Sequence, residues 1–564
     1  MSRLVVVSNR VALPGESRAG GLALALDAAL EESGGLWFGW SGRIDGKHSG
    51  RTHEHTAGNV QYVTMDLSQR DHDDYYTGFA HRTLWPLLHF RVDLVDYSRE
   101  TYAAYQRVNA LFAEKLSALL REDDLVWIHD YHLIPLASLL REYGVRCRMG
   151  FFLHVPMPSS DLLAALPQHK QLFEGLSAYD LVGFQTDRDL ERFQDYVRLF
   201  GRGRVISDGV LETPAGRRLC AGAFPISIDT RGIAEQAANA VNKPSVRRLA
   251  TSLSNRLLAI GVDRLDYSKG LPERFLAFER YLEQYPEQLG RLTYLQIAPV
   301  SRGEVDEYQA LRNELERLAG HINGGHADPD WTPMRYVNRN YPHASLTGYY
   351  RLAQVALVTP LRDGMNLVAK EYVASQDPKD PGVLILSIFA GAARELDTAL
   401  LVNPYDLDGV AAAIATATEM PLEERKERWR AMMNHLLVHD IVKWRSDFLT
   451  ALRESDRRLR PRGAAGAVVV ERWSVGRVSA AHPVPSLIHR PHAESPETAL
   501  NPRSRPTKPS APCAGRGDAN RTAAGRRSCT GHRRGCARAT LRPRTGDAAP
   551  ARTGRPASAP GGCS

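Results

Sequence analysis

The segment V-T-P-L-R-D-G-M-N-L-V-A-K-E, residues 358–371, is the most informative stretch of this chain. It follows an apolar run at residues 355–358 and leads into good helix formers, which predicts a buried strand, a tight turn and a helix start. The first N–H groups of such a helix have no intrahelical partner, so they bind anionic or hydroxyl-rich ligands. Gly364 allows a close backbone approach at the turn. The segment therefore predicts a ligand site.

Two carboxylates accompany this turn. Asp363 and Glu371 are separated by about two helical turns along roughly one face, where they would accept hydrogen bonds from sugar hydroxyls. The alternative is that Asp363 only caps the helix, and an Asp-Gly turn considered alone favours that role. A second motif reverses this preference and favours a ligand-binding role for Asp363.

The second motif is G-V-D-R-L-D-Y-S-K-G, residues 261–270, which follows an apolar run at residues 257–260. Arg264 and Lys269 fall in a strand-to-helix connection, and Pro272 suits the first turn of the next helix. Two cations beside helix N–H groups fit a diphosphate, whose negative charge grows when the sugar–phosphate bond breaks. The alternative is a pair of basic residues on the surface, which would predict nothing about the order or spacing of the residues in this motif.

The start of the chain has a related but weaker pattern. An apolar run at residues 4–7 leads to Arg10, and Gly20 and Gly21 then open a helical series. This order is typical of a phosphate-binding start. The signal is weak because the G-x-G-x-x-G pattern is missing.

Polar residues also follow two later apolar runs. The runs at residues 125–128 and 149–153 end at Asp130 and His154, in positions where open α/β sheets place their ligands. A single buried histidine is more often a hydrogen-bonded core residue, but a histidine at a strand end before two prolines is a site candidate.

Strand and helix patterns alternate through both halves of the chain. This alternation predicts an α/β fold of two doubly wound, Rossmann-like parallel-sheet domains with a cleft between them. The further predicted strands lie at residues 181–184, 225–229, 294–297, 334–337, 383–386 and 400–402, with 225–229 as the last strand of the first domain.

A length of 564 residues exceeds the usual limit for one hydrophobic core. We expect the hinge between the domains near residues 230–250. From residue 461 onward Pro, Arg, Ala, Gly and Ser dominate, a composition that cannot offset its conformational entropy and predicts disorder. The predicted parts are an N-terminal domain at 1–240, a C-terminal domain at 241–445, a crossover helix at 446–460 and a disordered tail at 461–564.

The net charge of +8 is concentrated in this tail. Residues 461–564 contain 18 Lys and Arg against 5 Asp and Glu, so the rest of the chain carries a net charge of −5. An acidic body has no electrostatic footprint for DNA or RNA. We therefore predict no specific nucleic-acid partner, and the sequence leaves a homo-oligomer open.

Other function classes are also disfavoured. Of the 6 cysteines only Cys147 and Cys220 precede residue 500, and neither has a partner at metal-ligand spacing. No stretch approaches the ~20 apolar residues of a membrane span, and the N-terminus lacks a signal-peptide apolar region. We predict a cytoplasmic protein with no membrane partner.

Both motifs resemble those of the trehalose-6-phosphate synthases, retaining glycosyltransferases of family 20 with the two-domain GT-B architecture, and the similarity extends over about residues 1–458. The resemblance implies transfer of glucose from a nucleotide-glucose, with UDP-glucose favoured, to glucose-6-phosphate. The product would be α,α-trehalose 6-phosphate, formed with retention in trehalose biosynthesis. No cofactor is implied. The residues themselves leave the nucleotide open between UDP, GDP and ADP.

The resemblance also assigns roles to individual residues. It implies acceptor binding by the first domain and nucleotide-sugar binding by the second. The candidate catalytic residues are Asp130, His154, Arg264, Lys269 and Asp363. The candidate donor-binding residues are Gly20, Gly21, His154, Arg264, Lys269, Tyr341, Asp363, Gly364, Met365, Asn366, Leu367, Val368 and Glu371. The candidate acceptor-binding residues are Arg10, Trp40, Tyr76, Trp85, Asp130 and Arg302.

Two further interpretations concern the acceptor side. We expect the three aromatic residues of that set in loops, where rings can meet the C–H faces of a sugar. The string Asp71-His72-Asp73 superficially resembles a metal-binding D-x-D motif. We interpret it as a solvated turn and predict no metal.

Three alternative functions remain beside this interpretation. A sister enzyme with another acceptor, such as glycerol 3-phosphate, is disfavoured by Arg10, Tyr76, Trp85 and Arg302, which match the trehalose-forming pattern. A non-catalytic regulatory subunit is disfavoured by the intact donor-side motifs. A phosphorylase would carry a lysine-linked pyridoxal phosphate. No motif supplies an obvious carboxylate nucleophile, which favours departure and attack on the same face of the sugar.

A chain that stops after Arg460 is expected to keep its cooperative melting and its glucosyl-transfer activity, because residues 461–564 have no core pattern. Thermal unfolding and turnover of the truncated and full chains test this. A truncated protein that unfolds or loses turnover would show that the tail is structural.

Overall fold

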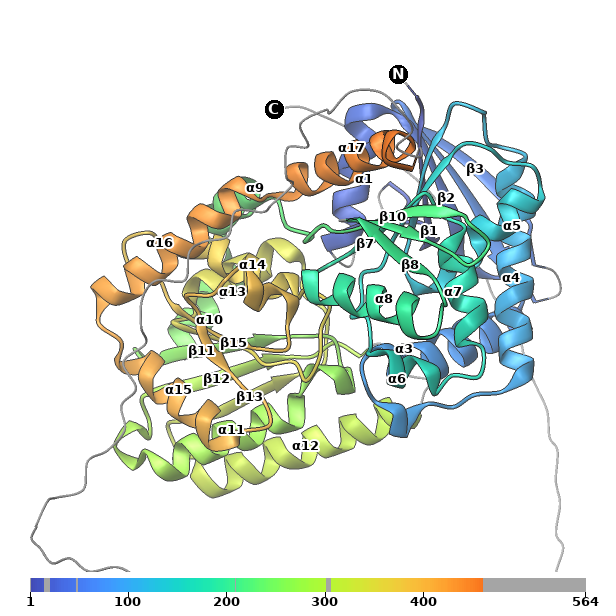
Figure 1. The fold of residues 1–564 in the computed structure, drawn as a ribbon. Helices are drawn as coiled ribbons and strands as arrows, with labels where there is room; N and C mark the ends of the chain where they lie inside the picture. Colours follow the sequence, from blue (N-terminus) through green and yellow to red (C-terminus); the bar gives the residue numbers. More distant parts are fainter. Residues whose placement is uncertain (1, 15–20, 47–48, 208, 301–305, 460–564) are drawn as a thin grey trace, which may run out of the picture. The chain divides into compact units, whose positions relative to one another are not determined.

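The structure is a computed structural model that describes residues 2–14, 21–46, 49–207, 209–300 and 306–459 (Figure 1). The chain separates into two compact units, residues 1–467 and 468–564, and every described residue lies in the first unit. The predicted tail at 461–564 lies outside the described residues. We call the part that carries the first sheet the first lobe and the part that carries the second sheet the second lobe.

The first sheet has ten strands among the described residues, and its centre is parallel. Its middle strands are apolar and buried on both faces, as expected for a parallel sheet covered by helices. The edges are antiparallel, with β3 paired to β4 and with β8, β9 and β10 paired in succession. In spatial order the strands are β3 (Thr52–Ala57), β4 (Val60–Leu67), β2 (Gly35–Ile44), β1 (Leu4–Arg10), β5 (Leu125–His129), β6 (Arg148–Phe152), β7 (Leu181–Phe184), β10 (Arg218–Ala223), β9 (Val210–Glu212) and β8 (Arg204–Ser207).

The second sheet has six parallel strands among the described residues. Their order in space is β13 (Met334–Val337), β12 (Leu292–Ile297), β11 (Leu257–Val262), β14 (Val355–Val358), β15 (Val383–Ser387) and β16 (Leu400–Val402). The prediction of two doubly wound parallel-sheet domains is confirmed. The domain boundaries remain a prediction.

Helices separate most of the strands (Figure 1). Several begin at a residue whose side chain caps the first turn, as Ser98, Thr186 and Asp406 do. In chain order the helices are α1 (Gly21–Ser33), α2 (Gln69–Asp71), the π-helix η1 (His72–Leu84), α3 (Trp85–Leu88), η2 (Val92–Leu94), α4 (Arg99–Ser117), η3 (Tyr131–Leu133), α5 (Leu136–Glu142), α6 (Ser160–Ala164), α7 (His169–Ser177), α8 (Asp187–Leu199), α9 (Thr230–Ala240), α10 (Pro244–Ser252), η4 (Tyr267–Lys269), α11 (Leu271–Gln284), η5 (Pro286–Gln288), α12 (Asp306–His326), α13 (His343–Leu352), α14 (Leu367–Ser375), η6 (Gly391–Arg394), α15 (Leu407–Glu419), α16 (Leu422–Val438) and α17 (Ile441–Leu459).

The parallel part of each sheet has one point where the strand order reverses. After β1 the chain builds one side of the first sheet and returns to β5 on the other side, and β11 and β14 are related in the same way. Ligands of open α/β sheets bind beyond the carboxyl ends of strands at such points. The two points present Arg10 and Asp130 in the first lobe, and the connections 263–270 and 359–366 in the second.

The last described helix, α17, packs on β6, β7 and β10 of the first sheet (Figure 1). Its Phe448 is fully buried and stacks on Trp127 with ring centroids 4.8 Å apart. Gly150 and Gly183 make room for this ring, because a Cβ at either position would lie 2.9 or 2.7 Å from a Phe448 carbon. The last described helix therefore packs on the sheet with which the chain began.

Two local predictions are wrong. Residues 225–229 are not a strand, because the backbone N–H and C=O of Ile226 bond to the side chains of Gln185 and Lys370 instead of a neighbouring strand. Asp71 does not lie in a solvated turn: it ends α2, is buried and accepts a hydrogen bond from Arg107 at 2.5 Å.

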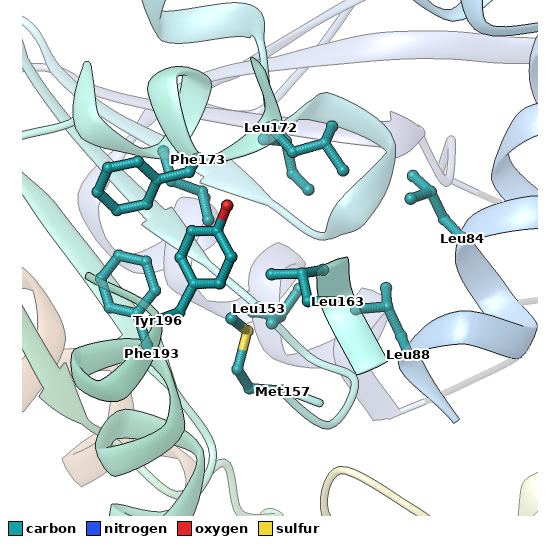
Figure 2. A pocket seen from close by; sticks show the side chains of 11 residues that line it. Leu84, Leu88, Leu153, Met157, Leu163, Leu172, Phe173, Phe193 and Tyr196 are labelled. Carbon is teal, nitrogen blue, oxygen red and sulfur yellow. The ribbon is translucent and has the colours of Figure 1, made fainter. Parts of the chain in front are cut away.

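An apolar pocket lies inside the first lobe, and none of the candidate site residues lines it (Figure 2). It is bordered by Leu84, Leu88, Ile134, Leu153, Met157, Leu163, Leu172, Phe173, Leu176, Phe193 and Tyr196. In the part of the chain that the structure describes, no helix combines the length and apolar character needed to cross a membrane.

Candidate active site

The connections after β11 and β14 meet at the switch point of the second sheet. The N–H groups of Leu361 and Arg362 donate to the Ser268 carbonyl at 2.9 and 3.3 Å. Beside them the Lys269 ammonium donates to Oδ2 of Asp363 at 2.5 Å, and both side chains are largely buried. Two candidate residues from the two sequence motifs therefore form one ion pair.

The Asp363 carboxylate is held in its ionised form. Burial raises the pKa of Asp363, but the Lys269 ammonium and the Asn366 amide, which donates at 3.1 Å, lower the pKa below its usual value. Asn366, with φ 73°, is the residue that caps α14, because its side-chain oxygen accepts from the Ala369 N–H at 3.3 Å. Asp363 thus precedes the helix, and the expected placement of Asp363 and Glu371 along one helical face is wrong.

Arg274 lies beneath both connections and joins three strand ends. Its guanidinium is 1 % exposed and donates to Asp263 after β11 at 2.6 Å and to Gln296 on β12 at 3.0 Å. It also donates to Thr359 after β14 at 2.9 Å and to the Lys269 carbonyl at 3.2 Å. Arg274 thereby positions the backbone that carries the ion pair.

The turn after β14 packs directly on the first lobe. A Cβ at Gly364 would lie 2.1 Å from the His154 carbonyl oxygen and 3.1 Å from Val155 Cα, which only glycine avoids. Gly391 packs in turn on Gly364, whose oxygen would lie 2.0 Å from a Cβ at residue 391. The close approach expected at Gly364 is an approach to the backbone of His154.

His154 is bonded on several sides. Its Nε2 lies 3.0 Å from Nδ1 of His129, its Nδ1 lies 3.4 Å from Nε2 of Gln185, and its N–H donates to Asp130 at 3.3 Å. Burial lowers the pKa of His154 to about 3, so the ring is neutral at neutral pH. A neutral imidazole can donate or accept a hydrogen bond but adds no charge to the site.

Asp130 adopts a strained backbone conformation with φ 74°. Its carboxylate accepts from the N–H groups of Tyr131 and His154 at 3.1 and 3.3 Å. A non-glycine residue at positive φ costs free energy, and such residues cluster at functional sites. The strain supports Asp130 as a site residue.

Acceptor-side and donor-side candidates meet at Trp85. The Arg264 guanidinium lies 5.7 Å from the Trp85 ring centroid, close enough for a cation–π contact. Trp85 Nε1 donates to Asp266 at 3.4 Å, and Asp266 also accepts from the Ser268 N–H at 3.0 Å. Trp85 of the first lobe therefore contacts the second sequence motif.

Three further acceptor candidates, Arg10, Trp40 and Tyr76, lie near the end of β1. The side chain of Arg10 lies over Gly42, where a Cβ would be 2.8 Å from Arg10 Nε. Trp40 and Tyr76 lie side by side with ring centroids 5.4 Å apart. The expectation that the aromatic residues lie in loops is wrong, because Trp40 is on β2, Tyr76 on η1 and Trp85 on α3. Helical π-segments such as η1 are often found at functional sites.

The other donor candidates surround the start of α14. Leu367 and Val368 are its first residues and are half-buried, and Met365 is buried in the turn before it. Glu371 lies one turn further, with Oε1 3.4 Å from Nε2 of His343. The interaction in which the Glu371 carboxylate accepts from the ring raises the pKa of His343.

Four candidates remain, and two of them lie outside the described residues. Tyr341 is half-buried, and its hydroxyl accepts from Arg339 Nε at 3.0 Å. Gly21 is the first residue of α1. Gly20 and Arg302 lie outside the described residues. Within the described ranges, no group of three or more His, Cys, Asp or Glu could hold a metal ion.

The sequence analysis missed His89. Its ring is 4 % exposed, lies against the Trp85 ring at 4.0 Å between centroids and has Nδ1 2.8 Å from the Trp85 carbonyl. Burial lowers the pKa of His89 to about 4, although the charges of Asp266 and Asp363 oppose this. A histidine one helical turn after Trp85, in the run W-P-L-L-H, was the available signal.

Comparisons with known proteins identify the family of this chain. Residues 6–454 match the model of Glycosyltransferase family 20. Trehalose-6-phosphate synthase from Sinorhizobium fredii is 52 % identical over 463 residues, which cover 81 % of this chain and 100 % of that protein.

Solved structures with similar folds include two that carry ligands. One is an α,α-trehalose-phosphate synthase (UDP-forming) from Burkholderia xenovorans in complex with glucose-6-phosphate. It has 49 % identity and a TM-score of 0.78, and the match covers 80 % of this chain and 100 % of that chain. The other is the trehalose-6-phosphate enzyme from E. coli bound with UDP-2-fluoro glucose. It has 48 % identity and a TM-score of 0.77, with 80 % and 99 % coverage.

The buried His89 predicts a pH dependence of stability. Its folded pKa of about 4 lies below the unfolded value near 6.5, so the unfolded chain binds the proton first and stability is lost as pH falls below about 6.5. Between about pH 7.5 and pH 5 the loss from this residue is ~2 kcal/mol. Urea unfolding of His89→Gln should show a pH-dependent loss smaller by that amount.

The exposed His321→Gln is the matched control and should keep the wild-type dependence. An unchanged loss in His89→Gln would contradict the burial of a neutral ring at this position.

Proposed function

Because this chain belongs to glycosyltransferase family 20, we propose that it transfers glucose from UDP-glucose to glucose-6-phosphate and forms α,α-trehalose 6-phosphate with retention. The observation that carries the proposal is the meeting of the Lys269–Asp363 ion pair with His154 where the two lobes touch. The similar structures support both substrates, since one is of a UDP-forming enzyme that holds glucose-6-phosphate and the other is bound with UDP-2-fluoro glucose.

The second lobe has the features needed for a leaving diphosphate. Lys269 and Arg264 are cations at the carboxyl end of β11, and the first N–H groups of α14 lie after β14. The negative charge on the phosphate grows as the bond to the sugar breaks, so these groups stabilise the transition state more than the bound substrate. Asp363 and Glu371 would accept hydrogen bonds from the sugar or ribose hydroxyls.

Retention fits departure and attack on the same face of the sugar. A double displacement needs a carboxylate nucleophile close to the donor carbon, but the described carboxylates at this place are already engaged. Asp363 is paired with Lys269 and Asn366, and Asp130 accepts from two backbone N–H groups. The acceptor hydroxyl would then pass its proton to the leaving phosphate, and catalysis would consist mainly of positioning and charge stabilisation.

The first lobe would bind the acceptor. Arg10 supplies a guanidinium for the sugar phosphate, and Trp40, Tyr76 and Trp85 supply ring faces for the sugar. Arg302 is proposed as a second cation for the same phosphate on the basis of the family motif. Because a nucleotide sugar and a sugar phosphate are both charged and do not cross membranes unaided, we place the reaction in the cytoplasm.

Turnover assays with UDP-, GDP- and ADP-glucose, each with glucose-6-phosphate or glycerol 3-phosphate, test the proposal. We expect efficient turnover only when UDP-glucose and glucose-6-phosphate are supplied together. The anomeric proton couplings of the product in NMR should show an α,α linkage. Turnover with glycerol 3-phosphate alone would indicate the sister enzyme. No turnover with any pair would favour a regulatory subunit.

Lys269→Ala tests the role of the donor-side cation. Loss of a charged hydrogen bond worth ~1.5–3 kcal/mol should lower turnover on the order of 10- to 100-fold, and at least as much as it weakens UDP-glucose affinity. Steady-state kinetics and calorimetric UDP binding measure the two effects. The exposed Lys379→Ala serves as control, and an unchanged kcat in Lys269→Ala would refute the role.

A further inference from the structure

Gln185 connects His154 to residues 224–229, which follow the last strand of the first sheet and which we call the crossing segment. It follows β7, and its side chain is 1 % exposed. Its Oε1 accepts from the Ile226 N–H at 3.0 Å, and its Nε2 lies 3.4 Å from Nδ1 of His154. The described contacts of Gln185 thus join a candidate catalytic residue to the crossing segment.

The orientation of the Gln185 amide follows from its partners. The Ile226 N–H can only donate, so the amide atom that faces it is the oxygen, and the NH₂ group faces His154. Nδ1 of His154 then accepts and carries no hydrogen. Since a neutral imidazole has one N–H, that hydrogen is on Nε2 and is donated to Nδ1 of His129 at 3.0 Å. The other tautomer would place two N–H groups against each other at His154 and Gln185.

Ile226 itself is fixed from the second lobe. Lys370 on α14 is fully buried and donates to the Ile226 carbonyl at 2.7 Å and to Glu395 at 2.6 Å. The two backbone polar groups of Ile226 are therefore bonded to opposite lobes. Lys370 directly precedes Glu371, so one residue of the crossing segment is tied to both sides of the candidate site.

We propose that Gln185 is a positioning residue that holds His154 in the tautomer with hydrogen on Nε2. The Nε2–H then stays bonded to His129, which fixes the His154 ring beside the place proposed for the donor sugar. The inference deepens the proposed function and rests on it for the identity of the sugar. It assigns a role to a residue that need not touch either substrate.

The surroundings of His154 add no competing charge at its ring nitrogens. The titratable groups that face it are His129 at the end of β5 and Asp130, which accepts from the His154 backbone N–H. The neighbouring strand β6 contributes the ring of Phe152, and α17 contributes the ring of Trp444. Gln185 is thus the group that decides which ring nitrogen is protonated.

Nitrogen-15 NMR of the histidine-labelled full chain tests the tautomer, with His154→Asn used to assign the signal. In the wild type, Nδ1 of His154 should show the shift of an unprotonated nitrogen. In Gln185→Leu, which removes the donor, the signal should indicate a mixture of tautomers. An Nδ1–H signature in the wild type, or an unchanged tautomer in Gln185→Leu, would overturn the proposal.

Kinetic measurements distinguish this positioning role from a merely structural one. Gln185→Leu should lower kcat/KM for UDP-glucose on the order of 10-fold, as expected for one neutral hydrogen bond. In Gln185→Glu the carboxylate attracts hydrogen to Nδ1 and raises the pKa of His154, so the favoured neutral tautomer is reversed. Its kcat/KM relative to wild type should recover as pH falls from about 8 to about 6, because the ring then regains hydrogen on Nε2.

Gln376→Glu is the matched control, since it places a buried carboxylate at the end of α14 away from His154. Its activity relative to wild type should show no such recovery. A ratio independent of pH in Gln185→Glu would overturn the proposal. If the wild type shows no turnover, the proposed function fails, while the NMR experiment still decides the tautomer.

Discussion

The second half of the candidate site depends on the buried ion pair between Arg274 and Asp263. Placing two charges in the interior costs desolvation, and burial raises the pKa of Asp263 against the attraction of Arg274. The pair is nevertheless surrounded by further acceptors from β12, from the turn after β14 and from the Lys269 carbonyl. Removing one partner of such a pair typically costs about 3–5 kcal/mol. The positions of Lys269 and Asp363 therefore depend on Arg274, a buried residue that bonds to the connections carrying both of them.

The two lobes contribute unlike chemistry to one place. The second lobe supplies cations and a helix start, which suit phosphate groups. The described face of the first lobe supplies one candidate cation, Arg10, together with buried neutral histidines, aromatic rings and a strained aspartate. Burial keeps His89 and His154 uncharged, so they add no positive charge beside Lys269. The division explains how a site can bind a diphosphate on one side and keep its hydrogen-bond donors for a sugar on the other.

Much of this arrangement could be predicted from the sequence. Strands buried on both faces, such as β11 and β14, form continuous apolar runs, and polar motifs directly after them mark the switch point. The strands β2, β3, β4, β8, β9 and β10 were not predicted. Of the two edge strands, β3 is polar and exposed and β8 is short. Such segments have no apolar pattern that distinguishes them from loops.

The errors in the site have a common physical cause. Ile226 lies in an apolar run that favours a strand, but side chains distant in sequence take both of its backbone groups. The local sequence favoured Asp363 as the cap of the helix, but Asn366 caps it. Asp363 is instead bonded to Lys269, which is far away in the sequence. Tertiary packing determines buried polar contacts of this kind, and a local sequence pattern does not reveal them.

The packing of Phe448 against Gly150 and Gly183 has a consequence for biosynthesis. During translation the first sheet emerges from the ribosome long before residue 448, so the groove over these glycines and the ring of Trp127 stays uncovered while the whole second sheet is made. The first lobe cannot complete its apolar core by vectorial folding alone. Its apolar core is completed only when α17 arrives, after nearly all of the described residues have been synthesised, so this apolar surface is exposed during most of translation.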